Sequence, residues 1–135
     1  MIVAAHQHGR LRFPHRETFQ TVQRVVAGEN RRDASVSIVF TDDRFIKNMN
    51  KRYLRHNRVT DVIAFSLPEG RGIEGEIYVN LDQARRQARD YGVAFKTEVK
   101  RLVIHGTLHL MGYRDSSPFL KSKMSRREDY YLARL

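Results

Sequence analysis

The sequence contains no cysteine among its 135 residues. Disulfide bonds and thiolate metal sites are therefore excluded, and the absence fits a protein that works in a reducing compartment. Long apolar runs are also missing. The first run, residues 1–5, is far too short for a signal peptide, and none approaches the roughly 20 residues that span a bilayer. We therefore expect a soluble, cytoplasmic protein without a membrane partner.

Acidic residues are outnumbered, with 15 Asp and Glu against 25 Lys and Arg, which gives a formal net charge of +10. Such a surplus favours a polyanionic partner, most simply nucleic acid. An anionic membrane would require a helix that pairs a basic face with a broad aromatic face, and no segment has that pattern. Repeats, low-complexity tracts and linkers are missing as well, so we predict one domain over residues 1–135.

The most informative stretch is HGTLHLMGYRD, residues 105–115. On a helix, His105 and His109 lie about 40° apart in rotation and about 6 Å apart along the axis, so both imidazoles can reach one ion. Gly112 can adopt the left-handed conformation that ends a helix, after which the chain can bring Asp115 back towards the same ion. Two imidazoles, one carboxylate and an open position are typical of a catalytic metal site.

The helix predicted for residues 95–111 has an apolar stripe with both histidines at its edge. Gly106 lies within the stripe, where it costs about 1 kcal/mol relative to Ala. Close approach of another backbone element or of substrate would explain it.

The spacing of histidines, glycine and third ligand is that of the metzincin peptidases. Those enzymes carry a glutamate base directly after the first histidine. Gly106 cannot move a proton, which argues against a peptidase.

We predict an α/β fold, a single domain with a small mixed four-stranded sheet surrounded by about five helices. The expected strands are residues 2–5, 34–40, 61–67 and 73–80; the expected helices are residues 14–27, 80–91, 95–111 and two more that start at 41–43 and 116–118. The connection from 34–40 to 61–67 is predicted to be a parallel, right-handed crossover. A turn at 68–72 would complete a hairpin. His6 and His8 have no partners nearby and are predicted to lie on the surface.

Two basic groups are candidate RNA contacts. Arg55 and Arg58 belong to the loop before the third strand, and Lys121 and Lys123 belong to the last helix. The alternative interpretation of both groups is ordinary solvation of a basic surface.

Three further residues are candidates for supporting chemistry. Thr60 and Asp61 would either accept hydrogen bonds from a ligand imidazole or cap a local turn. Glu76 would act as an acid or base, or simply lie on the solvated face of its strand.

The stretch HGTLHLMGYRD resembles the YbeY family signature HGxLHLxGYDH. Residues 50–65 (NKRYLRHNRVTDVIAF) resemble that family's N-x-x-Y-R…P-T-D-V-L-S-F segment, and residues 75–77 resemble its G-D-I. The resemblance implies a zinc-dependent hydrolase, namely a single-strand-specific endoribonuclease that acts in 16S rRNA 3′-end maturation and ribosome quality control. The implied partners are small-subunit rRNA and ribosomal proteins, and no DNA is expected.

The sequence departs from the family pattern at the site itself. The third family histidine aligns with Asp115, and the family arginine aligns with Leu54, beside which Arg55 could substitute. A carboxylate ligand binds zinc well but also suits harder ions, so we expect one divalent ion, Zn²⁺ before Mn²⁺. Water activated by the metal would attack a phosphodiester, with Arg55 or Arg58 steadying the phosphate and Glu76 as the candidate base.

Two alternatives remain open. One is a non-catalytic, RNA-binding ribosome-assembly factor with a structural metal, and the other is the metallopeptidase.

Overall fold

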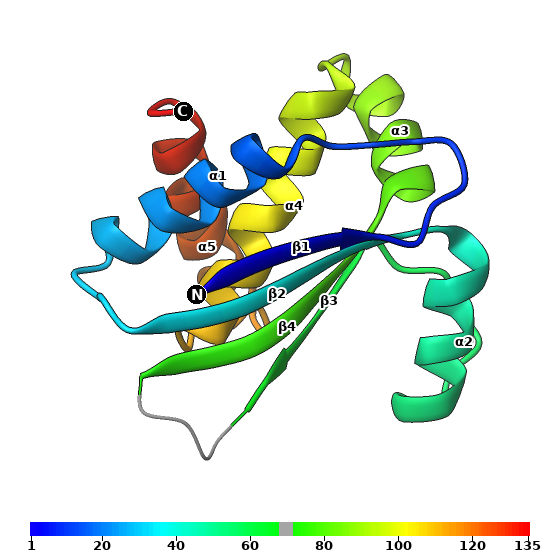
Figure 1. Ribbon diagram of the computed structural model, residues 1–135, viewed down its shortest axis with the longest axis horizontal. Helices are drawn as coiled ribbons and strands as arrows, with labels where there is room; N and C mark the ends of the chain where they lie inside the picture. Colours follow the sequence, from blue (N-terminus) through cyan, green and yellow to red (C-terminus); the bar gives the residue numbers. More distant parts are fainter. Residues whose placement is uncertain (68–71) are drawn as a thin grey trace.

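The computed structural model describes residues 1–67 and 72–135, and Figure 1 shows its elements. The strands are β1 (Ile2–His6), β2 (Ala34–Thr41), β3 (Val62–Ser66) and β4 (Ile73–Asn80); the helices are α1 (His15–Gly28), α2 (Asp43–Tyr53), α3 (Leu81–Tyr91), α4 (Phe95–Leu110) and α5 (Pro118–Leu132). The predicted α/β fold, with one small four-stranded sheet and five helices in the described residues, is confirmed. The predicted turn at 68–72 lies, apart from Gly72, outside these residues.

The sheet has the order β1-β2-β4-β3. β2 pairs in parallel with both β1 and β4, whereas β3 pairs antiparallel with β4. The predicted parallel crossover from β2 to β3 is therefore wrong, because β4 takes the place beside β2 and β3 becomes an edge. The hairpin was predicted, but the sequence does not show which of its strands lies inside. The eight-residue β4 buries alternate side chains in the core, while the five-residue β3 is mostly half-exposed, as expected for an edge strand.

Helix α4 lies at the centre of the helical layer. It contacts α1, α3 and α5 as well as β3 and β4, and Figure 1 shows these four helices on one side of the sheet, with α2 on the other. The core combines alternate side chains of β2 and β4 with the apolar stripe of α4: Val36, Ile38, Phe40, Ile77, Val79, Val99, Leu102 and Val103. The motif helix is thus held on three sides, and its last turn reaches the β3 edge.

Two glycines allow α4 to lie close to the sheet. A Cβ atom on Gly106 would lie 2.6 Å from Cγ2 of Ile77 on β4. A Cβ atom on Gly75 would lie 2.5 Å from Cδ2 of Leu110 and equally close to the carbonyl oxygen of Phe65. The predicted close approach at Gly106 is therefore confirmed, and the neighbour is a strand side chain. This contact brings α4 close to β4.

Side-chain caps define the starts of α2 and α3. The Asp42 side chain accepts a hydrogen bond from the Phe45 amide at the start of α2, and Asn80 accepts from Asp82 and Gln83 at the start of α3. Gly92 ends α3 in the left-handed conformation. None of the helices within residues 1–67 and 72–135 has the length and apolar character that a bilayer-spanning segment requires.

His8 is buried, contrary to the prediction of a surface position. Its Nδ1 accepts hydrogen bonds from the amides of Arg10 and Leu11, so its Nε2 donates to Oδ1 of Asp82, 2.7 Å away. Asp82 is 74 residues away in the sequence, which is why local pattern did not indicate the contact. His8 thereby links the β1–α1 connection to the first turn of α3.

Candidate metal centre and active-site cavity

Three predicted ligands meet at the end of α4. The Nε2 atoms of His105 and His109 lie 3.0 Å apart, and Oδ2 of Asp115 lies 3.6 Å and 3.4 Å from them. Donor atoms about 2.1 Å from a tetrahedral zinc ion lie about 3.4 Å from one another, so the three atoms fit such an ion. The three side chains are 23%, 29% and 45% exposed, which leaves a fourth position open to solvent. This arrangement can hold a divalent metal.

The turn that carries Asp115 is built by the end of α4. Gly112 has φ = 99°, and its amide donates to the carbonyl of His109. The Tyr113 amide donates to the carbonyl of Leu108. These two bonds form a Schellman motif, which reverses the chain direction. The predicted role of Gly112 is confirmed, since the reversal brings Asp115 to the histidines.

Glu128 of α5 is a partner of the site that the sequence analysis missed. Its Oε2 atom lies 2.8 Å from Nδ1 of His105, and its side chain is 9% exposed. Oε1 lies 3.5 Å from Nη1 of Arg101. A carboxylate on the second ring nitrogen fixes the tautomer of a ligand imidazole and leaves Nε2 for the metal. One sequence signal could have indicated that Glu128 faces the interior. It follows Met124, which is buried, by one helical turn, so the two side chains lie on the same face of α5.

The charge around His105 favours a cation. Burial alone would lower the pKa of His105, but the hydrogen bond to Glu128 and the carboxylates of Asp61 and Asp115 outweigh it, so the pKa is raised above the ordinary 6.5. The carboxylates that stabilise a proton on this imidazole stabilise a metal cation there as well.

A second carboxylate, Glu29, anchors the same turn. It accepts hydrogen bonds from the hydroxyls of Tyr113 (2.6 Å) and Tyr131 and from the guanidinium of Arg127 (2.7 Å). Burial alone would raise the pKa of Glu29, but these three donors together lower it. The end of α1, the turn after α4 and α5 are thus joined at one carboxylate. No local sequence pattern indicates this cluster, because its members lie up to 102 residues apart.

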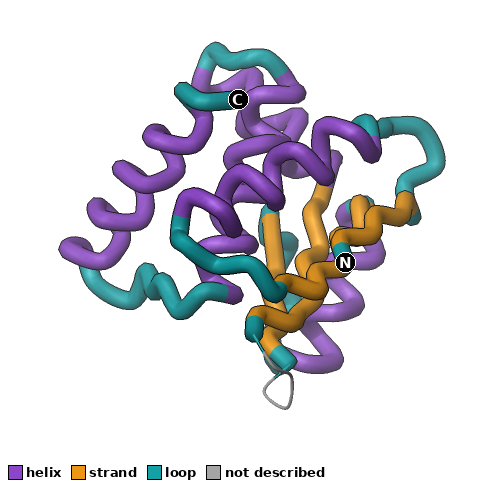
Figure 2. The backbone as a smooth tube through the Cα atoms, turned by 60° about the vertical axis from the view of Figure 1, so that its left-hand side comes forward, coloured by secondary structure: helices purple, strands orange, loops and turns teal. Residues whose placement is uncertain are grey.

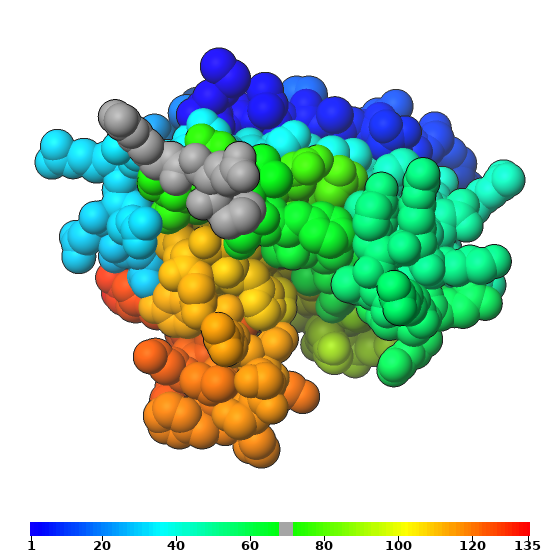
Figure 3. Space-filling model, turned by 90° about the horizontal axis from the view of Figure 1, so that it is seen from below, coloured from blue at the N-terminus to red at the C-terminus, as the bar shows by residue number. Residues whose placement is uncertain are grey.

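The three ligands border a cavity of about 510 Å³ between α4 and the β3 edge. It is lined by the ligands and Gly106, by residues 62–66 of β3, and by residues at the two ends of the preceding loop: Leu54, Thr60 and Asp61. Figure 3 shows this face, where the end of α4 and the turn after it (yellow to orange) border the hairpin strands (green) and α2 (teal).

Two buried asparagines fix the loop that leads into the cavity. Nδ2 of Asn50 donates to the Arg58 carbonyl (2.7 Å) and to Oγ1 of Thr60 (3.0 Å). Asn80 donates from Nδ2 to the Thr60 carbonyl (3.2 Å) and from its amide to the Asp61 carbonyl (2.8 Å). Both asparagines are fully buried. The backbone at Thr60 and Asp61 is therefore held at the cavity rim.

The structure does not bring every predicted residue to this cavity. Ile77 faces α4, so strand alternation turns Glu76 to the opposite face of the sheet, where the Tyr78 hydroxyl donates to it (2.6 Å). Glu76 is therefore not placed to act as the base that the sequence analysis predicted. Arg55 and Arg58 are exposed in the loop before β3, and Leu54 rather than Arg55 lines the cavity.

Lys121 and Lys123 are exposed on α5, which also carries Glu128. Nζ of Lys123 lies 5.8 Å from the centre of the Tyr113 ring, so this lysine lies beside the turn after α4. The position is compatible with contact to a polyanion bound near the site.

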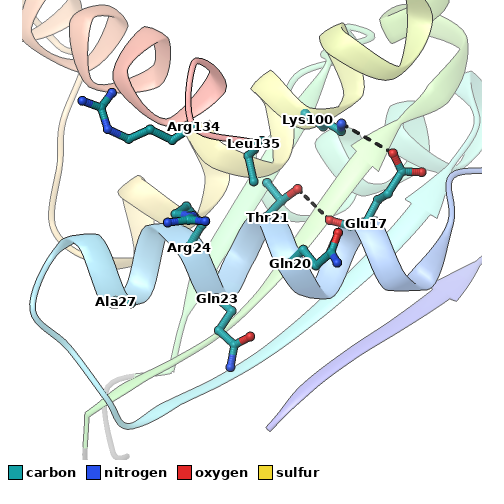
Figure 4. Close-up of a pocket in the computed structure, with 9 residues that line it drawn as sticks. All are labelled: Glu17, Gln20, Thr21, Gln23, Arg24, Ala27, Lys100, Arg134 and Leu135. Carbon is teal, nitrogen blue, oxygen red and sulfur yellow. Dashed lines mark hydrogen bonds and ion pairs between the residues drawn. The ribbon is translucent and has the colours of Figure 1, made fainter.

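Another hollow, of about 450 Å³, lies between α1, α4 and the last residues of the chain (Figure 4). Its acidic group, Glu17, is paired with Lys96 (3.0 Å) and Lys100 (3.5 Å). None of the three predicted metal ligands lines it. The reactive groups therefore gather at the cavity beside β3.

Comparisons with known proteins identify relatives of this chain. The family model described as Endoribonuclease YbeY matches residues 4–135. Curated relatives of that name include one from Chlorobaculum parvum, 40% identical over 86% of this chain and 82% of its own, and one from Salinibacter ruber, 41% identical over 82% and 76%. A relative of that name from Chlorobium phaeovibrioides is 33% identical over 98% of this chain and 89% of its own.

A similar fold is also known from a solved structure. The solution structure of a Thermotoga maritima protein superimposes with a TM-score of 0.66 and 24% identity, covering 98% of this chain and 87% of that one. At this identity the likeness supports the fold alone. The family match and the curated relatives carry the assignment, and the chain belongs to the endoribonuclease YbeY family.

Proposed function

We propose that this protein is a metal-dependent, single-strand-specific endoribonuclease that acts in 16S rRNA 3′-end maturation and ribosome quality control. The observation that carries the proposal is the triad of His105, His109 and Asp115 at the wall of an open cavity, in a chain of the YbeY family. The proposed partners are small-subunit rRNA and ribosomal proteins, and the proposed compartment is the cytoplasm, where ribosomes mature.

We propose Zn²⁺ as the metal, with Mn²⁺ as the second candidate because Asp115 supplies an oxygen ligand. Such an ion supplies an acidified water and polarises a phosphoryl oxygen. His105, His109 and Asp115 would hold it through the atoms that converge in the structure. Glu128 would keep His105 in the tautomer that presents Nε2.

Asp61 is the residue that we propose takes a proton from the nucleophile. It lines the same cavity as the triad, and its charge acts on His105. Its Oδ1 accepts a hydrogen bond from the Val62 amide (2.8 Å), which orients the carboxylate. Proton transfer through a positioned carboxylate is a common device of hydrolases.

The RNA strand would be held by the basic residues around the cavity. Arg55 and Arg58 are exposed in the loop before β3, whose last residues line the cavity, and Lys121 and Lys123 are exposed on α5, the helix that carries Glu128. Because the formal net charge is +10, a polyanion would be attracted over a long range at low salt. The charge on the protein thus favours a phosphodiester over a peptide substrate.

Gly106 gives a structural reason to prefer a nuclease over a metzincin-like peptidase. A side chain at this position, where those enzymes carry their glutamate, would collide with Ile77. A glutamate at this position would therefore have to displace Ile77.

Cleavage of a labelled single-stranded RNA by highly purified protein tests the proposal. The assay is run with chelator, with metal added back, and beside a His109→Ala variant purified identically. Loss of cleavage with both chelator and substitution is the expected result. Equal cleavage by wild type and His109→Ala would show a contaminating nuclease. Absence of cleavage by the metal-loaded wild type would reject a nuclease active by itself and favour an assembly factor.

A further inference from the structure

β3 is an edge strand whose second side faces the metal triad. In the sheet order β1-β2-β4-β3, its one strand partner is β4. The Asn80 amide donates to the Asp61 carbonyl, and the Leu67 amide donates to the Glu74 carbonyl. Residues 61 and 67 therefore direct their backbone groups towards β4.

Alternation along the strand assigns the remaining groups. In an antiparallel ladder, every second residue directs its N–H and C=O to the partner strand. Ile63 and Phe65 thus pair with β4, opposite Tyr78 and Glu76. The N–H and C=O groups of Val62, Ala64 and Ser66 point away from the sheet.

The shape of the cavity agrees with this assignment. All five residues of β3 line it, although their side chains alternate between two faces. Val62 and Ala64 pack against the core, whereas Phe65 packs against Tyr78 and Tyr53 on the other face. Consecutive residues can share one wall when that wall is the backbone edge. The cavity is therefore bounded by main-chain groups on one side and by the triad on the other.

The outward groups are not all used within the protein. The Val62 amide donates to Oδ1 of Asp61. The Ala64 amide donates no hydrogen bond to any group within residues 1–67 and 72–135. Exposed strand edges pair readily with another extended chain.

We infer that the outward edge of β3 binds the substrate strand, with the Ala64 and Ser66 main-chain groups hydrogen-bonded to an extended single strand of RNA beside the triad. The inference rests on the proposed function and names where its substrate lies. Outward groups recur every two residues, about 6.8 Å along the strand, which is on the scale of one extended nucleotide. Amide donors match phosphate oxygens, and carbonyl acceptors match ribose hydroxyls or base amino groups.

The surroundings favour RNA over a peptide as the occupant. The exposed Arg55 and Arg58 lie in the loop that leads directly into β3, where they would contact phosphates on one side of the edge. A duplex could not lay one strand flat along the edge, so this geometry also provides a physical basis for single-strand specificity.

An NMR titration of the zinc-loaded, ¹⁵N-labelled protein with a short, hydrolysis-resistant phosphorothioate RNA tests the inference. We expect the amide signals of Ala64 and Ser66 to shift and their hydrogen exchange to slow several-fold. The amides of Ile63 and Phe65, which pair with β4, are the internal control. Shifts confined to α5, or equal shifts of the control amides, would overturn the inference.

A matched pair of variants gives a second test. Ala64→Pro removes the outward N–H and leaves the β4 ladder intact, because proline is tolerated on the open side of an edge strand. Ala64→Ser retains the N–H. We expect RNA affinity to fall about tenfold or more in the proline variant alone, since a hydrogen bond to a charged acceptor contributes on that scale. Zinc stoichiometry and melting temperature report whether each variant is folded.

The outcomes separate the inference from the proposed function. Wild type that binds and cleaves RNA, with unchanged affinity in Ala64→Pro, would overturn the inference alone. If the proline variant does not fold, the wild-type titration decides. Wild type that neither binds nor cleaves RNA would reject both. Shifts of the Ala64 and Ser66 amides with an extended peptide but not with RNA would replace RNA by peptide as the occupant.

Discussion

Nδ1 of His105 and Oε2 of Glu128 lie 2.8 Å apart, although 23 residues separate them in the sequence. We expect Glu128→Ala to weaken Zn²⁺ binding about 10- to 100-fold, the usual cost of losing the carboxylate behind a ligand imidazole. Glu128→Gln should lie between, because its amide oxygen still accepts from Nδ1. Calorimetric titration with Zn²⁺ measures both. Asp129→Ala is the control, since Asp129 pairs with Arg101 and is 67% exposed. An equal loss of Zn²⁺ affinity in Asp129→Ala would show that Glu128 has no specific role in metal binding.

Asp115 offers a test of the third ligand. We expect Asp115→Ala to weaken binding of both Zn²⁺ and Mn²⁺. Asp115→His, which supplies a third imidazole, should raise the preference for Zn²⁺, because imidazole nitrogen suits zinc better than manganese. Competition titrations with the two ions measure this preference. Wild-type affinity in Asp115→Ala would show that the carboxylate does not bind the metal.

Substitutions of Asp61 and Glu76 test which of the two carboxylates acts as the general base. We expect Asp61→Asn to lower the rate of RNA cleavage about 10²- to 10⁴-fold, the range for loss of a general base, when both enzymes are saturated with zinc. Glu76→Gln should leave cleavage unchanged, because Glu76 faces away from the cavity. Single-turnover cleavage rates decide. A slow Glu76→Gln enzyme beside an active Asp61→Asn enzyme would reverse the assignment.

Gly106 and Ile77 should be coupled in stability. Alanine is the better helix former, yet we expect Gly106→Ala to destabilise the fold by about 1–3 kcal/mol, because its Cβ would overlap Cγ2 of Ile77. Removing that atom with Ile77→Ala should make the second substitution less harmful. Urea unfolding of the two single variants and the double variant gives the coupling. Additive effects would show that the two residues are not in contact.

Glu29 should make stability dependent on pH. Its folded pKa lies below the ordinary 4.5, so its stabilising effect is present above that pH and is lost as the pH falls through the folded pKa. We expect Glu29→Gln to lower the free energy of unfolding by about 1–3 kcal/mol at pH 7. The gap to wild type should shrink below pH 4.5. Urea unfolding between pH 7 and pH 3 checks the sign; a gap that widens on acidification would contradict it.

The parts of the site that the sequence predicted are the local ones. His105 and His109 are related by one helical turn. Gly112 follows closely enough to set the turn that brings Asp115 back to the two histidines. Such short spacings fix geometry through the backbone alone. The side-chain caps at Asp42 and Asn80 are local in the same sense, because each side chain bonds backbone amides two or three residues ahead.

The parts that the sequence could not predict depend on long-range packing. Glu128 reaches His105 because α5 lies along α4, and Asn50 and Asn80 converge on one loop from different elements. The order of β3 and β4 depends on which strand buries more surface, a property of the whole sheet. Glu76 lies on the face of β4 opposite α4, which matches the solvated-face alternative in the sequence analysis and not the role as a base.

The central position of α4 bears on how the metal is gained and lost. Both histidines project from a helix that is packed against three other helices and the sheet, so they are arranged before any ion arrives. Opening this helix would require nearly global unfolding, and its amides should be among the slowest to exchange. We therefore expect the ion to enter and leave a rigid, folded apoprotein, unlike small zinc domains that fold only when the metal binds.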